Sequence, residues 1–489
     1  MSKAYSSQQI QDFEKSIFIN PGDDLKLMEK AAADSASWLF KKFPNNGFII
    51  LCGPGNNGGD GYYIALELKR LKCEVKLIDV MATKKKSSLC AQAWRDASEL
   101  NFITIEELKV AKEDSVIVDA ILGIGGRSNL EPLVEKIIEL SERFQYRVSI
   151  DMPTGIDSNT GKSIDRHFKP HSTITFIALK IGQLINQGKI HSGDIVLETL
   201  GVKMKNDIKP VAETLTMEDI QSLLPKRKQE DHKGSHGKLL IVAGDEGYGG
   251  AGTLVSETAM KTGTGLIKLL TREQYVAPNI ARNPEIMVCG GDNAQDLESE
   301  FPWADIFVCG PGMFQNYWSE QLLYKLIEYA QRSDIPTLLD AGALRLLNTE
   351  AFSELELPEK LIITPHPGEA ASLLDISVTE VQEDRLQAAK TLQSRFGGTV
   401  VLKGHGTIVY DGDACYVCSV GGPELAVAGS GDVLSGIIGS LLSQGLEPKD
   451  AAISGVALHS AAGNQFTKNT GTIGLAANEL IILIRNLLN

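Results

Sequence analysis

The chain has 489 residues, of which 43% are hydrophobic and 22% are charged. At about 150 residues per domain, this length suggests two or three domains, and the composition excludes a mainly disordered chain. Lys and Arg number 48 against 62 Asp and Glu, so the formal net charge is −14. An acidic chain gains little from the counterion release that drives nucleic-acid binding or from anionic membranes, so both classes of partner are disfavoured.

The cysteines and the first residues indicate the cell compartment. Seven cysteines are spread along the chain, and their odd number argues against a disulfide framework. The first residues, MSKAYSSQQIQDFEKS, are polar and lack the apolar core of a signal peptide. No apolar run approaches the roughly 18 residues of a membrane-spanning helix. We therefore predict a cytoplasmic protein.

Short apolar strands that end in Gly-rich turns, each followed by a helical stretch, recur in both halves of the chain. Apolar strands without polar alternation are typical of parallel sheets buried on both faces, so we predict an α/β fold. The polar, charged stretch at residues 200–238 interrupts this rhythm. We predict a first domain over Met1–Glu213 and a second over Thr214–Asn489, with Thr216 as the N-cap of a short helix.

A glycine-rich turn in the first half is the first candidate site. The predicted strand Phe48–Cys52 runs into Gly53–Gly61, which holds five glycines, and then into a predicted helix over Tyr62–Leu71. Such a strand-to-helix turn lets the backbone approach a ligand, and the N–H groups at the helix start suit a phosphate. The turn lacks the Gly-Lys-Ser/Thr of a P-loop and the spacing of a dinucleotide fingerprint.

Two further strand ends in the same domain carry carboxylates. Asp119 ends the strand in VDAILGIGGR, and Asp151 follows the strand in RVSIDMPTGID, which also holds Thr154. A single Asp at a strand end is usually a helix cap or a turn former. Because the carboxyl ends of parallel strands meet at one edge of a sheet, these ends together with the Gly-rich turn predict a polar ligand site.

The motifs GPGNNGGDG, VDAILGIGGR and DMPTGID, together with LMEKAAADSA near the N-terminus, resemble the NAD(P)H-hydrate epimerase (YjeF N-terminal) family. The resemblance implies a Rossmann-like three-layer αβα domain. It implies K⁺ ligands at Asn57, Asp119 and Thr154, and Asp151 is our candidate for the catalytic proton carrier. The substrate-binding residues that it implies are Asn56, Asn57, Gly58, Gly59, Asp60, Gly123, Ile124, Gly125, Gly126, Arg127, Ser128, Asn129 and Asp151.

A second glycine-rich turn lies near the C-terminus. Ala428–Asp432 forms a predicted turn before an apolar helix predicted over Val433–Leu442. Its N–H groups would stabilise negative charge on a transferring phosphoryl group, and Asp432 would accept a proton from an attacking hydroxyl. An Asp that simply caps a helix gives the same pattern, so this motif alone does not decide between the two interpretations.

Further motifs of the second domain are GDEGYGGAG, the GPG at Gly310–Gly312, TPHPGEA and VLKGHGTIV. With the Gly-Ser-Gly-Asp turn they resemble the ADP-dependent NAD(P)H-hydrate dehydratase (YjeF C-terminal, ribokinase-like) family over Lys233–Leu488. The resemblance implies a ribokinase-like αβα domain that uses ADP and Mg²⁺, with Glu369 helping to organise the metal. The implied hydrate-site residues are Ala251, Gly312, His366 and Asp432, of which Asp432 is the catalytic base. The implied nucleotide-binding residues are Lys403, Gly404, His405, Gly406, Thr407 and Gly431.

The order of the two domains resembles bifunctional NAD(P)H-hydrate repair enzymes. That resemblance implies a homo-oligomer that epimerises R and S NAD(P)H hydrate (NADHX and NADPHX) and dehydrates the S form with ADP, releasing AMP and phosphate. One alternative is a ribokinase-like small-molecule kinase with an N-terminal ligand-binding module, against which the PHPGE motif and the fused first domain argue. Another is a non-enzymatic first domain, against which the retention of Asn57, Asp119, Asp151 and Thr154 argues.

Overall fold

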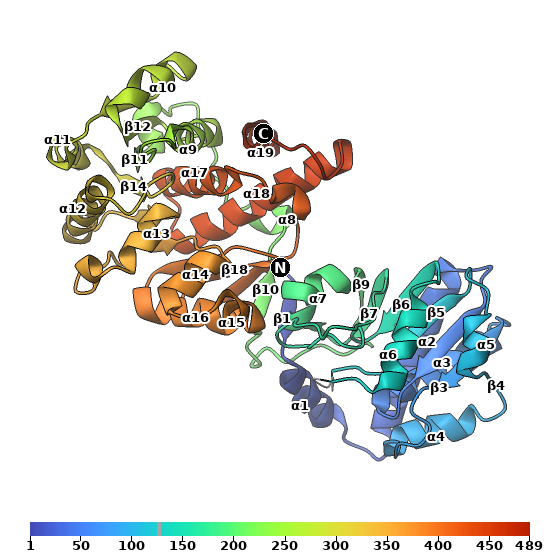
Figure 1. The fold of residues 1–489 in the computed structure, drawn as a ribbon. Helices are drawn as coiled ribbons and strands as arrows, with labels where there is room; N and C mark the ends of the chain where they lie inside the picture. The colour runs from blue at the N-terminus through green and yellow to red at the C-terminus, as the bar shows by residue number, and fades with distance from the viewer. Residues whose placement is uncertain (125–128) are drawn as a thin grey trace. The chain divides into compact units, whose positions relative to one another are not determined.

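The computed structural model describes residues 1–124 and 129–489. It divides into two compact units, Ser2–Ala212 and Glu213–Asn489, with Met1 assigned to the second (Figure 1). The predicted domain boundary, between Glu213 and Thr214, lies one residue from this division. Four residues of the predicted substrate loop, Gly125, Gly126, Arg127 and Ser128, lie outside the described residues.

The first unit is built on a parallel sheet of seven strands in the order β4-β3-β2-β5-β6-β7-β9. Its strands are β2 (Phe48–Cys52), β3 (Val75–Asp79), β4 (Asn101–Phe102), β5 (Val116–Ala120), β6 (Tyr146–Ile150), β7 (Ser172–Phe176) and β9 (Asp194–Glu198), and β1 (Lys3–Tyr5) pairs with β8 (Leu179–Lys180) beside it. Its helices are α1 (Ser7–Ile17), α2 (Asp23–Lys42), α3 (Asn56–Arg70), α4 (Ser88–Asp96), α5 (Ile105–Lys109), α6 (Pro132–Ser141) and α7 (Asn186–His191).

Strand β2 shows why this unit has three layers. Alternate residues of a strand point to opposite faces, and all five residues of β2 are buried. Phe48 and Ile50 belong to an apolar cluster that also holds residues of α2, α3 and α4, whereas Ile49 and Leu51 belong to a second cluster with α5 and α6. The sheet is therefore covered on both faces, which confirms the predicted αβα class for this unit.

The second unit also contains a mainly parallel sheet, with the strand order β13-β12-β11-β14-β15-β16-β17-β18-β19-β10, in which β18 is antiparallel to both neighbours. Its strands are β10 (Ala212–Thr214), β11 (Lys238–Val242), β12 (Leu266–Thr271), β13 (Met287–Gly290), β14 (Ile306–Cys309), β15 (Thr337–Leu339), β16 (Leu361–Ile363), β17 (Thr399–Leu402), β18 (Thr407–Tyr410) and β19 (Cys415–Cys418). Its helices are α8 (Met217–Ile220), α9 (Gly249–Thr262), α10 (Val276–Arg282), α11 (Ala294–Glu298), α12 (Tyr317–Ser333), α13 (Gly342–Leu347), α14 (Pro367–Leu374), α15 (Val378–Glu383), α16 (Arg385–Phe396), α17 (Ser430–Ser443), α18 (Pro448–Asn469) and α19 (Ala477–Leu487).

Strand β14 separates the two faces of the second sheet. Ile306 and Val308 join the apolar cluster that contains residues of α9, α17, α18 and α19. Phe307 points the other way and packs against Tyr329 of α12, with 6.2 Å between the ring centroids. Helices thus cover both faces here too (Figure 1).

Two predicted helix starts are wrong. Helix α3 begins at Asn56, not Tyr62, and α17 begins at Ser430, not Val433. A Cβ on Gly58 would lie 1.8 Å from the carbonyl oxygen of Gly53, and one on Gly436 would lie 2.6 Å from that of Val255. Gly58 thus lets the first turn of α3 pack against the turn before it, and Gly436 lets α17 pack closely on α9 farther along the helix. The predicted N-cap at Thr216 is confirmed.

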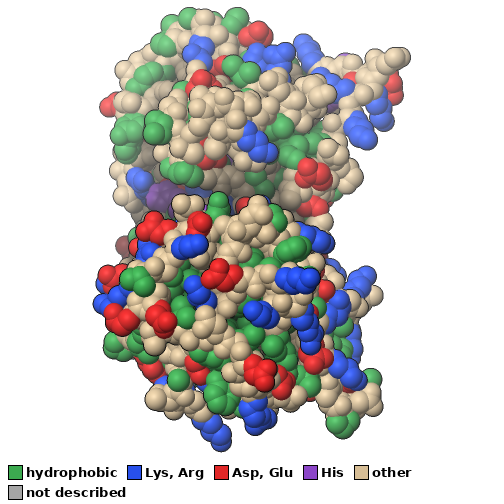
Figure 2. All heavy atoms as spheres, turned by 90° about the vertical axis from the view of Figure 1, so that its right-hand side faces the viewer, with side chains coloured by type: hydrophobic (Ala, Val, Ile, Leu, Met, Phe, Trp, Pro, Cys, Tyr) green, Lys and Arg blue, Asp and Glu red, His purple; other side chains and the backbone are tan. Residues whose placement is uncertain are grey.

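The surface and the helices bear on possible partners. Acidic and basic side chains are interspersed on the face shown in Figure 2, in keeping with a net charge of −14. Among the described residues, no helix is both long and apolar enough to cross a membrane.

Candidate active sites

Three neighbouring strands of the first unit, β2, β5 and β6, end at one edge of the sheet and bring the predicted residues together. Asn57 lies in the first turn of α3, which follows β2, and Asp119 lies in β5. A Cβ on Gly123 would lie 3.0 Å from Asp151 Oδ2 and 3.3 Å from Asn57 Cβ. The predicted site residues that the structure describes here therefore face one another across a narrow space.

Asp119 is the centre of a buried hydrogen-bond network. Its side chain is fully buried, and it accepts hydrogen bonds from the Thr154 hydroxyl (2.7 Å), the Thr154 N–H (2.8 Å), the Ser149 hydroxyl (3.0 Å) and the Ile121 N–H (3.2 Å). Burial raises the pKa of Asp119 to about 6, and these hydrogen bonds oppose the rise. The network fixes the Thr154 hydroxyl, which also accepts the N–H of Leu122 at 3.1 Å.

Asn57 supplies the observation that fits a cation. Its side chain is only 8% exposed, and neither its amide oxygen nor its amide nitrogen has a hydrogen-bond partner among the described residues. A buried amide without a partner costs free energy, so such a group usually faces a ligand. A carbonyl-type oxygen, a carboxylate and a hydroxyl are hard donors that suit K⁺. Asn57, Asp119 and Thr154 therefore fit the predicted cation.

Asp151 is held by a lysine that the sequence analysis did not identify. The Lys180 ammonium donates to Asp151 Oδ1, to Thr175 Oγ1 at 2.8 Å and to the Phe176 carbonyl at 3.1 Å. The Lys180 side chain is 1% exposed and that of Asp151 13%. Asp151 has φ of +67°, a left-handed conformation that non-glycine residues rarely adopt. Such strain concentrates at functional sites. The lysine at the end of an apolar strand, in FIALK, was the available signal.

Two more carboxyl groups of this unit have raised pKa values. Burial, with the charge of Asp151, raises the pKa of Glu14 in α1 to about 7. Burial is the largest of the effects that raise the pKa of Asp60 well above its usual value, and the charges of Asp151 and Glu14 add to it. The charge of Lys180 lowers both. The site therefore holds proton-carrying groups beside Asp151, and Glu14 was missed because a Glu in an amphipathic helix gives no signal.

In the second unit, the parallel strands β11, β14, β15, β16 and β17 all end at one edge, which carries the predicted dehydratase residues. Lys403 follows β17, and its ammonium donates to Asp340 Oδ1 at 2.8 Å. Asp340 follows β15, and its Oδ2 accepts the hydroxyl of Ser435 in α17 at 2.8 Å. The charge of Lys403 holds the pKa of Asp340 below its usual value against the effect of burial. Asp340 ends TLLD just as Asp119 and Asp151 end their strands, but the sequence analysis did not take it up.

Asp432 lies in the first turn of α17 beside this pair. Burial and the charge of Asp340 raise its pKa to about 7, and Lys403 opposes the rise. A Cβ on Gly431 would lie 3.5 Å from Lys403 Nζ, so the Gly-Ser-Gly-Asp segment directly adjoins the Lys403 ammonium. A carboxylate with a pKa near neutrality is suited to accept a proton from a substrate hydroxyl.

His366 and Glu369 interact with each other at the start of α14. The His366 N–H donates to Glu369 Oε2 at 2.9 Å, and His366 Nε2 lies 3.2 Å from Glu369 Oε1. His366 Nδ1 accepts the N–H groups of Gly368 (3.0 Å) and Glu369 (3.3 Å). The Glu369 side chain is 4% exposed, and both of its oxygens are engaged. The Glu369 carboxylate closes the cap of α14 and lies 3.9 Å from Lys403 Nζ, and its part in organising Mg²⁺ stays a prediction.

Ala251 and Gly312 are in contact, as a shared hydrate site requires. A Cβ on Gly312 would lie 2.8 Å from the Cβ of Ala251, and Gly312 has φ of +66°. The Gly312 carbonyl also accepts the N–H of Asp245 at 2.8 Å. Asp245 in turn accepts Arg272 Nε at 2.8 Å, and this ion pair holds the loop after β11 against the residue that follows β12.

The predicted nucleotide loop, Lys403–Thr407, is held by a buried arginine. Arg385 is fully buried and donates to the carbonyl oxygens of His405 (2.6 Å), Leu402 (3.1 Å) and Lys403 (3.2 Å). It forms no ion pair with any described carboxylate, and burial lowers its pKa to about 10. Because C=O and N–H point to opposite sides of a trans peptide, bonding these carbonyls to Arg385 turns the Gly404 and Gly406 N–H groups away from it. Those N–H groups are then available to a phosphate.

We expect replacement of Arg385 by Met to weaken ADP binding by at least about tenfold, because hydrogen bonds from a charged donor contribute about 1.5–3 kcal/mol and this loop would lose three. Calorimetric titration with ADP and Mg²⁺ measures the affinity, and thermal unfolding shows whether the variant is folded. Arg395→Met is the matched control, since Arg395 lies in the same helix and bonds the carbonyl of Leu373 instead. Unchanged ADP affinity in a folded Arg385→Met variant would contradict this role.

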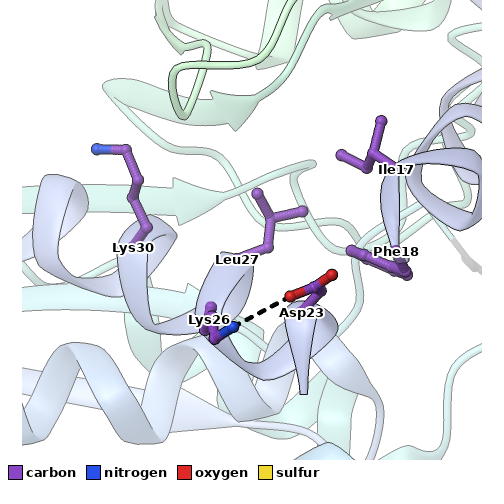
Figure 3. A pocket seen from close by; sticks show the side chains of 6 residues that line it. All are labelled: Ile17, Phe18, Asp23, Lys26, Leu27 and Lys30. Carbon is purple, nitrogen blue, oxygen red and sulfur yellow. Dashed lines mark hydrogen bonds and ion pairs between the residues drawn. The ribbon is translucent and has the colours of Figure 1, made fainter. Parts of the chain in front are cut away.

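A separate cavity of about 230 Å³ lies between α1 and α2 (Figure 3). It is lined by Ile17, Phe18, Asp23, Lys26, Leu27 and Lys30. Lys26 Nζ pairs with Asp23 Oδ1 at 3.1 Å at its rim. None of the predicted site residues lines this cavity, so it is not part of either site.

Comparison with known proteins decides the family. A family model described as NAD(P)H-hydrate dehydratase matches residues 239–486, and one described as YjeF-related protein N-terminus matches residues 24–182. The bifunctional NAD(P)H-hydrate repair enzyme of Coxiella burnetii is 36% identical, with 100% of each chain covered. The chain belongs to the bifunctional NAD(P)H-hydrate repair enzyme family. The Escherichia coli enzyme of that name is also 36% identical, over 90% of this chain and 85% of its own.

Among solved structures, the ADP/ATP-dependent NAD(P)H-hydrate dehydratase of Bacillus subtilis, co-crystallised with ATP and Mg²⁺, is 29% identical with a TM-score of 0.51. It covers 56% of this chain and 97% of its own. A ribokinase-like superfamily protein of Enterococcus faecalis is 27% identical with a TM-score of 0.53, covering 58% of this chain and 98% of its own. The predicted two-domain α/β fold with a ribokinase-like second domain is confirmed.

Proposed function

We propose that this member of the bifunctional NAD(P)H-hydrate repair family epimerises R and S NADHX and NADPHX in its first unit and dehydrates the S form with ADP in its second. The full-length match to enzymes named for both activities supports the pair of reactions. The observation that best supports chemistry in this chain is Asp432, whose pKa of about 7 and position beside Lys403 and Asp340 suit a base for phosphoryl transfer.

For the first unit, the hydrate is a hemiaminal, with a hydroxyl on C6 next to the ring nitrogen. The nitrogen lone pair expels the C6 hydroxyl, a proton makes it leave as water, and water returns to either face of the resulting iminium ion. We assign to Asp151 the proton that is given to the leaving hydroxyl and taken back from the returning water. Lys180 fixes Asp151 by an ion pair. Asn56–Asp60, Gly123, Ile124 and Asn129 would contact the substrate.

For the second unit, hydroxide is a poor leaving group and phosphate a good one. Asp432 takes the C6 hydroxyl proton while the hydroxyl oxygen forms a bond to the ADP β-phosphorus, and the bond from that phosphorus to the bridging oxygen breaks to release AMP. The ring nitrogen then expels phosphate, and loss of the C5 proton restores NAD(P)H. His366, Ala251 and Gly312 would contact the hydrate.

A related structure supports the nucleotide and Mg²⁺, whereas K⁺ is supported by residues of this chain. The related dehydratase holds ATP and Mg²⁺, which supports a nucleotide and Mg²⁺ here, and Lys403–Thr407 with Gly431 would hold the nucleotide. When bound, Mg²⁺ neutralises charge on the transferred phosphoryl group. We assign K⁺ to Asn57, Asp119 and Thr154 on the strength of the unpartnered Asn57 amide. A homo-oligomeric state and a cytoplasmic location stay predictions.

The test of this function is recovery of the near-ultraviolet absorbance of NADH from a mixture of R and S NADHX. We expect full recovery with Mg²⁺ and ADP, with AMP and free phosphate formed in equal amounts. A product that keeps the phosphate would favour the kinase alternative. No recovery with either ADP or ATP would contradict the repair function.

We expect the rate of dehydration at low substrate to rise with pH and to level off above about pH 7. Asp432 acts as a base only when it is deprotonated, and its pKa is about 7, so below that pH the rate falls about tenfold per pH unit. The initial rate of NADH recovery from S-NADHX, measured with saturating ADP between about pH 6 and pH 8.5, gives the profile. A flat profile would contradict proton acceptance by Asp432.

A further inference from the structure

A second cavity opens beside the predicted phosphate-binding turn. It has a volume of about 310 Å³, and its lining includes Asp79, Lys84, Lys86, Trp94 and Arg95. Asp79 is the last residue of β3, and Trp94 and Arg95 lie in α4. Strand β3 is the neighbour of β2 in the sheet, so the cavity, which includes the last residue of β3, lies at the edge where ligands bind in open parallel sheets.

The chain segment that carries Lys84 and Lys86 is bonded to the phosphate-binding turn through the next residue, Ser87. The Ser87 hydroxyl donates to Asn56 Oδ1 at 2.7 Å, and the Ser87 N–H donates to the Pro54 carbonyl at 2.9 Å. Ser87 follows Lys84 and Lys86 directly and is the N-cap of α4. Ser87 therefore connects the turn that would hold a ligand phosphate to the segment that lines the cavity.

The strand order indicates which part of the substrate enters. NAD(P)HX is a dinucleotide, with a nucleoside on each side of its pyrophosphate. Asp151, which is assigned to the hydrated ring, follows β6, and the proposed cation ligand Asp119 lies in β5; both strands are on one side of β2. If the pyrophosphate lies at the start of α3, the adenosine half leaves on the other side of β2, where β3 ends.

The side chains that line the cavity are suited to an adenosine that carries an additional phosphate on its ribose. The Trp94 side chain is 41% exposed and offers a ring on which a base can stack. Lys86 pairs with Asp79 at 2.8 Å and lies 5.8 Å from the Trp94 ring centroid, so it is already engaged. Lys84 pairs at the surface with Glu131, and Arg95 has no ion pair among the described residues. Both are exposed and can turn toward an anion.

We propose that this cavity binds the adenosine end of the hydrate and that Lys84 and Arg95 bind the 2′-phosphate that distinguishes NADPHX from NADHX. The proposal rests on the epimerase function of the first unit. Arginine and lysine beside the second strand of a nucleotide-binding sheet are suited to a ribose 2′-phosphate, and charge-assisted bonds give the selectivity. The first unit then acts on NADPHX at lower concentrations than on NADHX.

The test is epimerisation of R-NADPHX and R-NADHX without ADP or ATP, so that the second unit performs no dehydration. In the double variant Lys84→Gln, Arg95→Gln, we expect the KM for NADPHX to rise at least about tenfold and that for NADHX less than about twofold. Lys69→Gln, Arg70→Gln is the matched control. It removes the same two charges from exposed positions in the last turn of α3, and should change neither KM.

Equal effects on the two substrates, or no effect on either, would overturn the proposal. If the wild-type chain epimerises neither substrate, the epimerase function fails, and the cavity is tested by binding alone. Calorimetric titration then compares adenosine 2′,5′-bisphosphate with 5′-AMP. The proposal expects tighter binding of the bisphosphate by the wild-type chain and loss of that difference in the double variant. Equal binding of the two probes by the wild type would overturn it.

Discussion

Replacement of Asp432 by Asn is expected to slow ADP-dependent recovery of NADH from S-NADHX by about 10²–10⁴-fold, the usual loss when a catalytic base is removed. Asn keeps the size of the side chain and the start of α17 but cannot accept the hydroxyl proton. Stopped assays that quantify AMP and NADH together measure the effect. Because Asp432 lies in the second unit, the same variant should epimerise NADHX at the wild-type rate.

Asp375→Asn serves as the control for that experiment. Asp375 ends α14 in a left-handed conformation, with φ of +54°, which Asn also tolerates, and it lies away from the site. If Asp432→Asn recovered NADH at the wild-type rate, Asp432 would be a helix-cap residue and the base would lie elsewhere. Asp340 would not replace it, because Lys403 and Ser435 already hold its oxygens.

Replacement of Asp151 by Asn is expected to remove epimerisation and to leave dehydration intact, the opposite of the effect of Asp432→Asn. Given both epimers, Mg²⁺ and ADP, the variant should convert S-NADHX to NADH quickly. It should consume R-NADHX only as fast as this epimer converts spontaneously to the S form, since enzymatic epimerisation would fall about 10²–10⁴-fold. Asn tolerates the φ of +67° at this position and can still accept a hydrogen bond from Lys180, so we expect the fold to be kept. Chromatography of the two epimers over time measures the effect.

Asp114→Asn is the control here, because Asp114 is exposed in the turn before β5. If the Asp151→Asn variant consumed both epimers rapidly, Asp151 would not be the catalytic proton carrier. Glu14, with a pKa of about 7 and in the same cluster of charges, would then be the group to test. A Glu14→Gln variant in the same assay separates these outcomes.

The strands were predictable from sequence, and the helix starts were not. Phe48–Cys52 is an apolar run bounded by glycines, and the structure has a strand over the same residues. The glycines after it were interpreted as a loop because glycine lowers helix propensity. Gly58 is nonetheless helical, since only a residue without a side chain fits against the Gly53 carbonyl. Gly61 in the same helix lies against a distant strand, since a Cβ there would lie 2.8 Å from the Cβ of Ala120, so contacts outside the segment override its low helix propensity.

The candidate sites show the same limit. Asp119, Asp151 and Asp432 stand at strand ends or helix starts, where local pattern identifies them. Lys180 and Arg385 act on other residues through contacts across the fold. Lys180 has only the weak signal of a lysine that ends an apolar segment, and nothing in its own segment distinguishes Arg385 from an ordinary basic residue. Arg385 opens a helix in EDRLQAA, a sequence typical of a solvent-facing surface, yet it is fully buried.

Among the described residues, the apolar clusters beneath the two catalytic edges have no residue in common: Val118 and Ile150 lie in a cluster of first-unit residues, and Val401 and Val433 lie in a cluster of second-unit residues. Each catalytic edge therefore rests on a core of its own. A substitution in one of these clusters removes packing from its own unit, so it can remove one activity while the other persists. If only the epimerase core failed, a cell carrying such a chain would still convert S hydrates to NAD(P)H. R hydrates would then be consumed only as fast as they epimerise spontaneously.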